Sequence, residues 1–176
     1  MTNQSTDWIR YTQNEINQSL EELFTCYPNN VLKDAMCHAV LNGGKRIRSL
    51  IIKSVGSAFN IEKNILNQLS VAIELIHAYS LIHDDLPAMD NDDYRRGQPT
   101  CHKKFGESQA ILAGDALQSL AFEVLSSDKL NIVSNNKTSI IHFFANAIGA
   151  KGMVLGQSKD MIFTGQTINI KQLSEM

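Results

Sequence analysis

The sequence predicts an all-α protein, and three observations support that prediction. Only three prolines occur in 176 residues, and over long stretches apolar residues recur at the 3.6-residue spacing of a helix. No Asn-Gly or Asp-Gly turn joins two alternating segments, as a β-hairpin of the commonest kind would require. The chain has no internal repeat, low-complexity tract or linker, and its length suits one domain with a substantial core. We therefore expect a single helical domain over residues 1–176.

The first two helices are predicted from apolar stripes near the amino terminus. A helix over residues 6–25 carries four apolar residues on one stripe, namely Ile9, Ile16, Leu20 and Leu23. A second helix is expected over about 30–42, where Val31, Ala35 and Ala39 repeat at four-residue spacing. Gly43 and Gly44 follow it directly, and glycines are common helix terminators.

The remaining helices are predicted in the same way. A third covers about 45–58, and a fourth, over about 65–85, is apolar on nearly every face. A helix of that kind lies at the centre of a bundle. Further helices are expected at 107–126, 134–149 and about 150–160.

Composition excludes several classes of partner. The formal net charge is −2, so no overall basic field would attract nucleic acid or an anionic membrane. The three cysteines, Cys26, Cys37 and Cys101, are too few for a disulfide scaffold. The amino terminus lacks the basic and apolar regions of a signal peptide, and no long apolar run predicts a transmembrane segment. We expect a cytoplasmic protein.

An acidic run followed by two arginines is the most informative feature of the chain. Between Asp84 and Gly97 it reads D-D-L-P-A-M-D-N-D-D-Y-R-R-G, with five carboxylates in ten residues. Most acidic runs are solvated loops, but this one directly follows an apolar helix. Carboxylates beside guanidinium groups can hold a polyanion through bridging divalent cations, which predicts chemistry on a metal-complexed diphosphate.

Pro87 explains how two of these acids can cooperate. Asp84 and Asp90 are six residues apart, about 120° out of phase on a regular helix. A proline between them ends or distorts the helix, so that the chain can curl and return Asp90 toward Asp84. Such a pair suits Mg²⁺, which takes few protein ligands and keeps positions for water and phosphate oxygens.

Side chains before the acidic run form a wall on the central helix. His77 precedes Asp84 by seven residues, close to two full turns, so both share one face about 10 Å apart along the axis. Ser80 lies one turn before Asp84, and Tyr79 projects toward a neighbouring helix. A chain attached to a bound diphosphate would pass these residues.

The segment G-G-K-R-I-R at 43–48 predicts a second anion site. Lys45 and Arg48 are three residues apart and are expected on one face of a helix's first turn. Backbone amides at that end add positive potential. The segment lacks the spacing of a Walker loop.

Together these segments, with F-G-E and A-I-L-A-G-D-A-L downstream, resemble the trans-isoprenyl diphosphate synthases, above all the bacterial enzymes that make farnesyl diphosphate. The resemblance covers nearly all of the chain from residue 40 onward. It implies the isoprenoid-synthase helical bundle, of which this chain would be the amino-terminal half to two-thirds. It also implies Mg²⁺ as cofactor, isopentenyl and dimethylallyl or geranyl diphosphate as substrates, and a homodimer.

The resemblance assigns roles to individual residues. Asp84 and Asp90 would bind the metal with support from Asp85, and Arg95 would contact the allylic diphosphate. The catalytic set is then Asp84, Asp85, Asp90 and Arg95. Isopentenyl diphosphate would be held by Lys45, Arg48, His77 and Arg96. Tyr79 and Ser80 resemble residues that limit product length.

Two departures from the family pattern stand out. Ser49 replaces the proline that usually follows G-G-K-R-x-R, which we expect to change the entry of the helix. The family's second aspartate-rich segment, which would hold the remaining metals, is absent. We therefore expect a fragment, a frameshifted product or an engineered truncation, with little or no condensation activity by itself.

Three alternatives remain. A geranylgeranyl diphosphate synthase would have nearly the same acidic segment. A non-catalytic subunit could bind a partner synthase or sequester diphosphate. A metal phosphohydrolase built on His83 and Asp84 would need a further histidine ligand, for which His38 is the upstream candidate besides His77.

Overall fold

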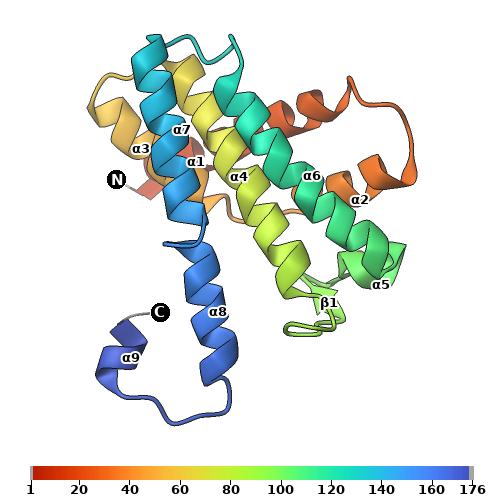
Figure 1. Ribbon diagram of the computed structural model, residues 1–176. Helices are drawn as coiled ribbons and strands as arrows, with labels where there is room; N and C mark the ends of the chain where they lie inside the picture. The colour runs from red at the N-terminus through yellow and green to blue at the C-terminus, as the bar shows by residue number, and fades with distance from the viewer. Residues whose placement is uncertain (1, 175–176) are drawn as a thin grey trace. The chain divides into compact units, whose positions relative to one another are not determined.

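The computed structural model describes residues 2–174, with side chains from residue 6, and it is almost entirely helical (Figure 1). The all-α prediction is confirmed. The chain groups into two compact units, one ending at Asn131 and one beginning at Ile132, which we describe separately. The expectation of one domain over the whole chain stays a prediction.

Over its described residues, 2–131, the first unit contains six helices and one short hairpin. The hairpin lies between the fourth and fifth helices, after the acidic run. The helices are α1 Thr2–Phe24, α2 Val31–Leu41, α3 Ile47–Ala58, α4 Lys63–Asp84, α5 Cys101–Phe105 and α6 Glu107–Ser126, and the strands are β1 Tyr94–Arg95 and β2 Gln98–Pro99.

Helix α4 is the centre of this unit, as its apolar composition predicted. It packs most extensively against α6, beside which it runs in Figure 1, and also against α3, α2 and α1. The contact with α6 is close at Gly114, where an added Cβ would lie 2.2 Å from His83 Nε2. The largest fully buried apolar side chains of the unit are Ile16, Leu20, Val40, Leu75, Ile76, Leu117, Leu125 and Leu130.

The buried stripe of α1 differs from the predicted one. Ile9 is 39% exposed, whereas Thr12 and Phe24 are buried together with Ile16 and Leu20. The packed residues thus repeat every four positions along one ridge, which a helix presents to its neighbours. Val31 is also exposed, because it is the first residue of α2 and lies at the open end of that helix.

The hairpin was not predicted. Tyr94 pairs with Pro99 and Arg95 with Gln98, so only Arg96 and Gly97 form the turn. Both have positive φ, 54° and 76°, as a tight two-residue turn requires. Arg96 provides the first of these left-handed residues in place of the usual Asn or Asp.

The second unit contains α7 Ser134–Ile148, α8 Met153–Phe163 and α9 Ile170–Ser174. The first two match the ranges expected near 134–149 and 150–160, and α9 continues beyond them. Ile148 is the one buried residue among the described side chains of these three helices. Many of their large apolar residues are exposed.

Two helical segments are long and apolar enough to span a membrane by length and composition alone. They are α4 and the segment Ser134–Phe163. Core helices of soluble proteins pass the same test, and half of the apolar window of α4 is buried within the protein. The expectation of no transmembrane segment stays a prediction.

Candidate functional site

The acidic run begins where α4 ends. Asp84 is the last helical residue, and beyond Pro87 the Asp90 N–H donates to the Asp84 carbonyl at 2.9 Å. A second bond, from the Asn91 N–H to the Leu86 carbonyl at 3.1 Å, closes the same turn. The backbone of Asp90 therefore returns to the end of the helix, and both acidic residues lie at one tip.

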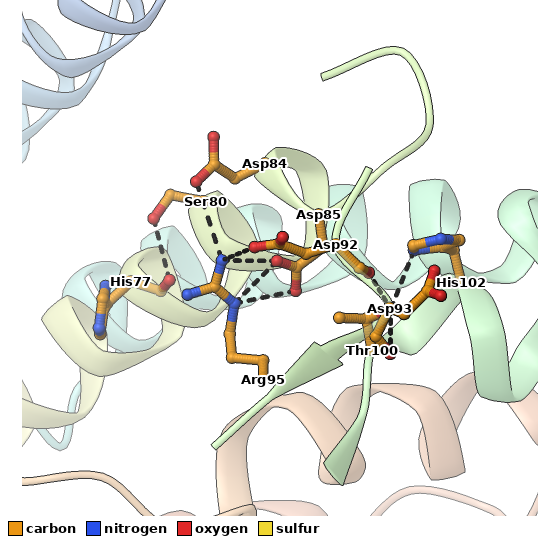
Figure 2. A network of polar contacts seen from close by, with 9 residues as sticks. All are labelled: His77, Ser80, Asp84, Asp85, Asp92, Asp93, Arg95, Thr100 and His102. Atoms are coloured by element: carbon orange, nitrogen blue, oxygen red, sulfur yellow. Dashed lines mark hydrogen bonds and ion pairs between the residues drawn. The ribbon is translucent and has the colours of Figure 1, made fainter. Parts of the chain in front are cut away.

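Arg95 joins the hairpin to this tip (Figure 2). Its Nε donates to both oxygens of Asp85, at 2.8 and 3.0 Å, and its Nη2 donates to Asp85 Oδ1 at 2.5 Å. Asp92 and Asp84 also approach Nη2, at 3.6 and 4.0 Å. The hydrogen bonds that Asp85 accepts from Arg95, with the nearby carboxylate charges, raise the pKa of Arg95.

The carboxylates of the run thus have different surroundings. Asp85 is buried and bonded to Arg95, so it supports the tip. The Asp84 side chain is 24% exposed, and Asp90 is exposed. A solvated cation at the helix tip can therefore reach both Asp84 and Asp90, whereas the exposed Asp92 lies closer to the Arg95 guanidinium, at 3.6 Å.

These donors fit a magnesium ion. Among residues 6–174, no three side chains of His, Cys, Asp or Glu converge as a preformed metal cage. That excludes a closed structural zinc site in the described region, which needs four such ligands. Mg²⁺ commonly takes only one or two carboxylates and completes its octahedron with water and phosphate oxygens.

The base of the acidic loop is fastened by Thr100. Its hydroxyl donates to the Asp92 carbonyl at 2.7 Å, and its N–H donates to the Asp93 carbonyl at 3.0 Å (Figure 2). The Asp93 carboxylate pairs with Lys103 at 2.7 Å. Asp93 therefore fixes the loop and lies outside the helix tip.

The second cluster, which we call the cradle, comprises Gly43–Arg48 with His77 and Arg96. These residues line one cavity of about 590 Å³. Lys45 is not in the first turn of a helix, as the sequence suggested, because α3 begins at Ile47. Arg46 caps the helix in a left-handed conformation, with φ 52°, so the chain turns there and Lys45 and Arg48 reach the cavity from different backbone segments.

The two glycines make room for Arg96. The Arg96 Nη1 donates to the Gly43 carbonyl. A Cβ at Gly44, where φ is +125°, would lie 2.7 Å from the same nitrogen. Gly43 also ends α2 as predicted, because it directly follows the cap residue Asn42 and has a φ of +78°. In addition, the two glycines form the surface against which this guanidinium lies.

His77 lies on the cavity wall as a neutral side chain. Burial, with the charges of Arg48 and Arg96, lowers the pKa of His77 to about 4. At neutral pH it therefore offers hydrogen bonds without charge. Burial also lowers the pKa of Arg96, and the Arg46 charge adds to that effect.

Tyr79 and Ser80 lie between the cradle and the tip on α4. The Ser80 hydroxyl donates to the His77 carbonyl of its own helix at 2.9 Å. The Tyr79 ring packs edge-on against His83, with centroids 5.0 Å apart. His83 Nε2 in turn bonds to the Ile111 carbonyl at 3.2 Å and lies 3.9 Å from Asp115.

Sequence reasoning missed two residues at the cradle, Arg46 and Glu74. Both are buried, and Arg46 Nη1 lies 3.1 Å from Glu74 Oε2. The available signal in the sequence was Glu74, a single acid inside an otherwise apolar helix. A buried carboxylate needs a partner, so this acid indicated that a basic residue lies near it.

The structure does not support the metal phosphohydrolase interpretation. His38 Nε2 lies 2.8 Å from the Pro99 carbonyl, and its Nδ1 lies 3.3 Å from Lys104 Nζ. His83 bonds to the Ile111 carbonyl. The two histidines are therefore engaged in different places and do not form a shared metal site.

Comparison with known proteins supplies independent information. Residues 29–176 match the polyprenyl synthetase family model. The chain is 47% identical over 167 residues to the farnesyl diphosphate synthase of Haemophilus influenzae, covering 94% of this chain and 56% of that protein. It is 43% identical over 162 residues to geranylgeranyl pyrophosphate synthase 4 of Arabidopsis thaliana, covering 92% of this chain and 43% of that protein.

The fold agrees with these sequence matches. The crystal structure of an FPP/GFPP synthase from Zymomonas mobilis superposes with a TM-score of 0.92 at 37% identity. That match covers 97% of this chain and 63% of the other. The chain therefore spans about half the length of the curated relatives it matches and somewhat more of the solved chain.

Proposed function

The chain belongs to the polyprenyl synthetase family, and from that membership we propose a prenyltransferase function. The protein would condense isopentenyl diphosphate with dimethylallyl or geranyl diphosphate to give farnesyl diphosphate, with Mg²⁺ as cofactor. One observation carries this proposal. The acidic residues at the carboxyl end of α4, including Asp84, Asp85 and Asp90, form a carboxylate tip. This tip and the cationic cradle lie along the same central helix, and Arg95 is joined to the tip whereas its neighbour Arg96 is joined to the cradle.

Each residue has a defined task in that reaction. Asp84 and Asp90 would hold Mg²⁺, which neutralises charge on a diphosphate leaving group when bound. Arg95 binds the allylic diphosphate from the hairpin side. Asp85 keeps the Arg95 guanidinium oriented through three hydrogen bonds.

The cradle binds the second substrate. Lys45, Arg48 and Arg96 supply the positive charge for its diphosphate, and His77 supplies a neutral hydrogen-bonding group. The allylic C–O bond breaks, the double bond of isopentenyl diphosphate attacks the carbocation, and a proton leaves the adduct. Catalysis of this kind depends on charge stabilisation by fixed groups and on exclusion of water, and it needs no protein nucleophile.

A calorimetric titration tests the metal-dependent half of this function. The chain is titrated with a bisphosphonate in excess Mg²⁺ and again in EDTA. We expect a larger binding heat in Mg²⁺ than in EDTA, because the carboxylates at the tip repel the ligand without a cation and only the cradle can bind it then. Identical heats under both conditions contradict the proposal.

Turnover is tested separately. Geranyl and isopentenyl diphosphates are incubated with the chain and Mg²⁺, its mass being verified by mass spectrometry. We expect little condensation, because the chain spans about half of its relatives' length. Robust turnover by the 176-residue species would show that the described site is sufficient by itself.

A geranylgeranyl diphosphate synthase is the second candidate. Tyr79 is only partly buried and is supported by a single edge-on ring contact with His83, so its function as a floor for the growing chain is open to test. In any preparation that condenses, Tyr79→Ser should lengthen the product if this ring limits growth. If the unsubstituted protein already makes products longer than fifteen carbons and Tyr79→Ser leaves their length unchanged, the second candidate is favoured.

A non-catalytic role is the third. If the chain binds diphosphate but never turns over, a subunit that supports a separate synthase explains the binding. Co-purification with a full-length synthase from this family, with activity restored in the mixture, would favour that role over an enzyme acting alone.

A further inference from the structure

A buried polar network lies directly behind the cradle. Glu74 on α4 receives one hydrogen bond on each carboxylate oxygen. The Ser49 hydroxyl donates to its Oε1 at 2.7 Å, and Arg46 Nη1 donates to its Oε2 at 3.1 Å. All three side chains are at most 6% exposed. Arg46 and Glu74 border the cavity, but almost all of their surface, and all of that of Ser49, is buried.

Arg46 ties three helices to one turn. Its Nε donates to Asn17 of α1 at 2.9 Å, its Nη2 donates to the Val40 carbonyl of α2 at 2.8 Å, and Glu74 belongs to α4. The residue itself is the left-handed cap of α3, a conformation that is unfavourable for a non-glycine residue. The hydrogen bonds of Arg46 to three different helices hold that conformation and keep the turn in place.

The same turn determines the positions of the Lys45 and Arg48 side chains at the cradle. Lys45 immediately precedes Arg46, and Arg48 follows it by two residues; both are exposed, whereas Arg46 is buried. The Lys45 carbonyl is also held by Gln13 Nε2 at 2.8 Å. Any rotation of the Arg46 backbone would therefore displace Lys45 and Arg48 at the cavity.

Ser49 is the part of this network that departs from the usual family pattern. We expected the serine to alter only the entry of α3, but its hydroxyl is fully buried and bonded to Glu74. Without it, Glu74 Oε1 would lose the hydrogen bond from Ser49, and a buried carboxylate oxygen without a partner is unfavourable.

We infer that Ser49, Glu74 and Arg46 form a positioning network that fixes Lys45 and Arg48 for diphosphate binding. This inference rests on the proposed function and adds three residues that act by holding the turn, since each is at most 6% exposed. The network acts through the left-handed turn. Its loss should weaken the cradle without affecting the carboxylate tip.

The test compares Ser49→Ala with Ser54→Ala, an exposed serine on the same helix. The affinity of the cradle is measured by calorimetry with isopentenyl diphosphate in EDTA. The affinity of the tip is measured with a bisphosphonate in excess Mg²⁺. We expect Ser49→Ala to weaken the first affinity about tenfold and to leave the second within about twofold, whereas Ser54→Ala changes neither.

A second variant and a second readout guard against a general loss of structure. Glu74→Gln keeps the shape but removes the charge that faces Arg46, and it should weaken the cradle in the same selective way. Hydrogen exchange of the amides at 43–48 should accelerate in both variants, with helix content by circular dichroism unchanged. These amides belong to the turn that the network holds.

Three outcomes overturn the inference. Ser49→Ala could bind isopentenyl diphosphate like the unsubstituted chain, or both affinities could fall equally, which indicates only lost stability. The unsubstituted chain could also fail to bind isopentenyl diphosphate in EDTA. If bisphosphonate binding in Mg²⁺ persists in that last case, the metal-dependent half of the proposed function stands, whereas the roles of the cradle and of the network both fail.

Discussion

The carboxylate tip and the cradle both contain arginines, but they balance charge in opposite ways. At the tip, Arg95 has three carboxylates within 4.0 Å. At the cradle, the buried Arg46 takes the one nearby carboxylate, Glu74. Within residues 6–174, none of Lys45, Arg48 and Arg96 forms an ion pair with a carboxylate.

Under the proposed function, this difference would let the two regions bind diphosphates in different ways. The cradle can attract an anion with its own charge. The tip is acidic, so an anion would bind there only after a cation, and departure of a leaving group would depend on that cation. Experiments that affect one region and spare the other are therefore the most informative.

The largest expected effect comes from Asp84→Asn. We expect Mg²⁺-dependent bisphosphonate affinity to fall about 100-fold, because the metal loses a charged ligand at the helix tip. Isopentenyl diphosphate binding in EDTA should not change. Calorimetry checks both.

Asp93→Asn is the matched control for that variant, because Asp93 belongs to the same run but pairs with Lys103. Equal losses in the two variants would mean that the acidic run acts only through its overall charge.

The second effect concerns stability at the tip. Asp85→Asn removes the carboxylate that accepts three bonds from Arg95. Arg95 is about one-third exposed, so water compensates in part, and we expect a loss of about 1–3 kcal/mol in the free energy of unfolding. Urea denaturation followed by circular dichroism measures it.

The comparison for that variant is Asp92→Asn. Asp92 also faces Arg95, but at 3.6 Å and with a side chain 53% exposed. Surface pairs of this kind contribute up to about 1 kcal/mol. A loss from Asp92→Asn as large as that from Asp85→Asn would refute the division of roles.

The third effect is confined to the cradle. Gly44→Ala places a Cβ 2.7 Å from Arg96 Nη1 in a backbone conformation unfavourable to side chains. We expect about tenfold weaker isopentenyl diphosphate binding in EDTA, with binding at the tip retained. Gly43→Ala has the same kind of backbone cost but meets no atom within 4 Å, so it should weaken binding less.

The smallest effect is a pH dependence of stability that arises from His77. Its folded-state pKa of about 4 lies below the ordinary value of 6.5, so between these two values the unfolded chain binds more protons. Stability from this residue is therefore complete above about pH 6.5 and is lost as the pH falls toward 4.

Urea titrations at pH 7 and pH 4.5 check that effect. After allowance for partial exposure, His77→Asn should reduce the difference in unfolding free energy between the two pH values by about 1 kcal/mol. The exposed His142→Asn serves as the control. The expectation fails if both variants keep the full dependence.

Periodicity and local residue types predicted most of the helices. The apolar composition of α4 placed it at the centre, and Pro87 indicated the turn that brings the Asp90 N–H to the Asp84 carbonyl. These features depend on neighbours in the sequence, which is why they could be read without a structure.

What could not be predicted depends on distant contacts. The hairpin has strands of two residues, too short for an alternating pattern, and its turn uses Arg96 with positive φ. Arg46 looks like a third basic residue of the cradle in the sequence. Only its contacts with Asn17, Val40 and Glu74, each from a different helix, show that it is buried.

The hairpin also has a consequence for how precisely the two regions are matched. Arg95 and Arg96 are consecutive, and the first still belongs to a strand while the second begins the turn. One peptide unit therefore directs one guanidinium to the tip and the other to the cradle. A shift of this strand by one residue would turn each side chain to the opposite face, so the register of the hairpin determines which arginine serves which region.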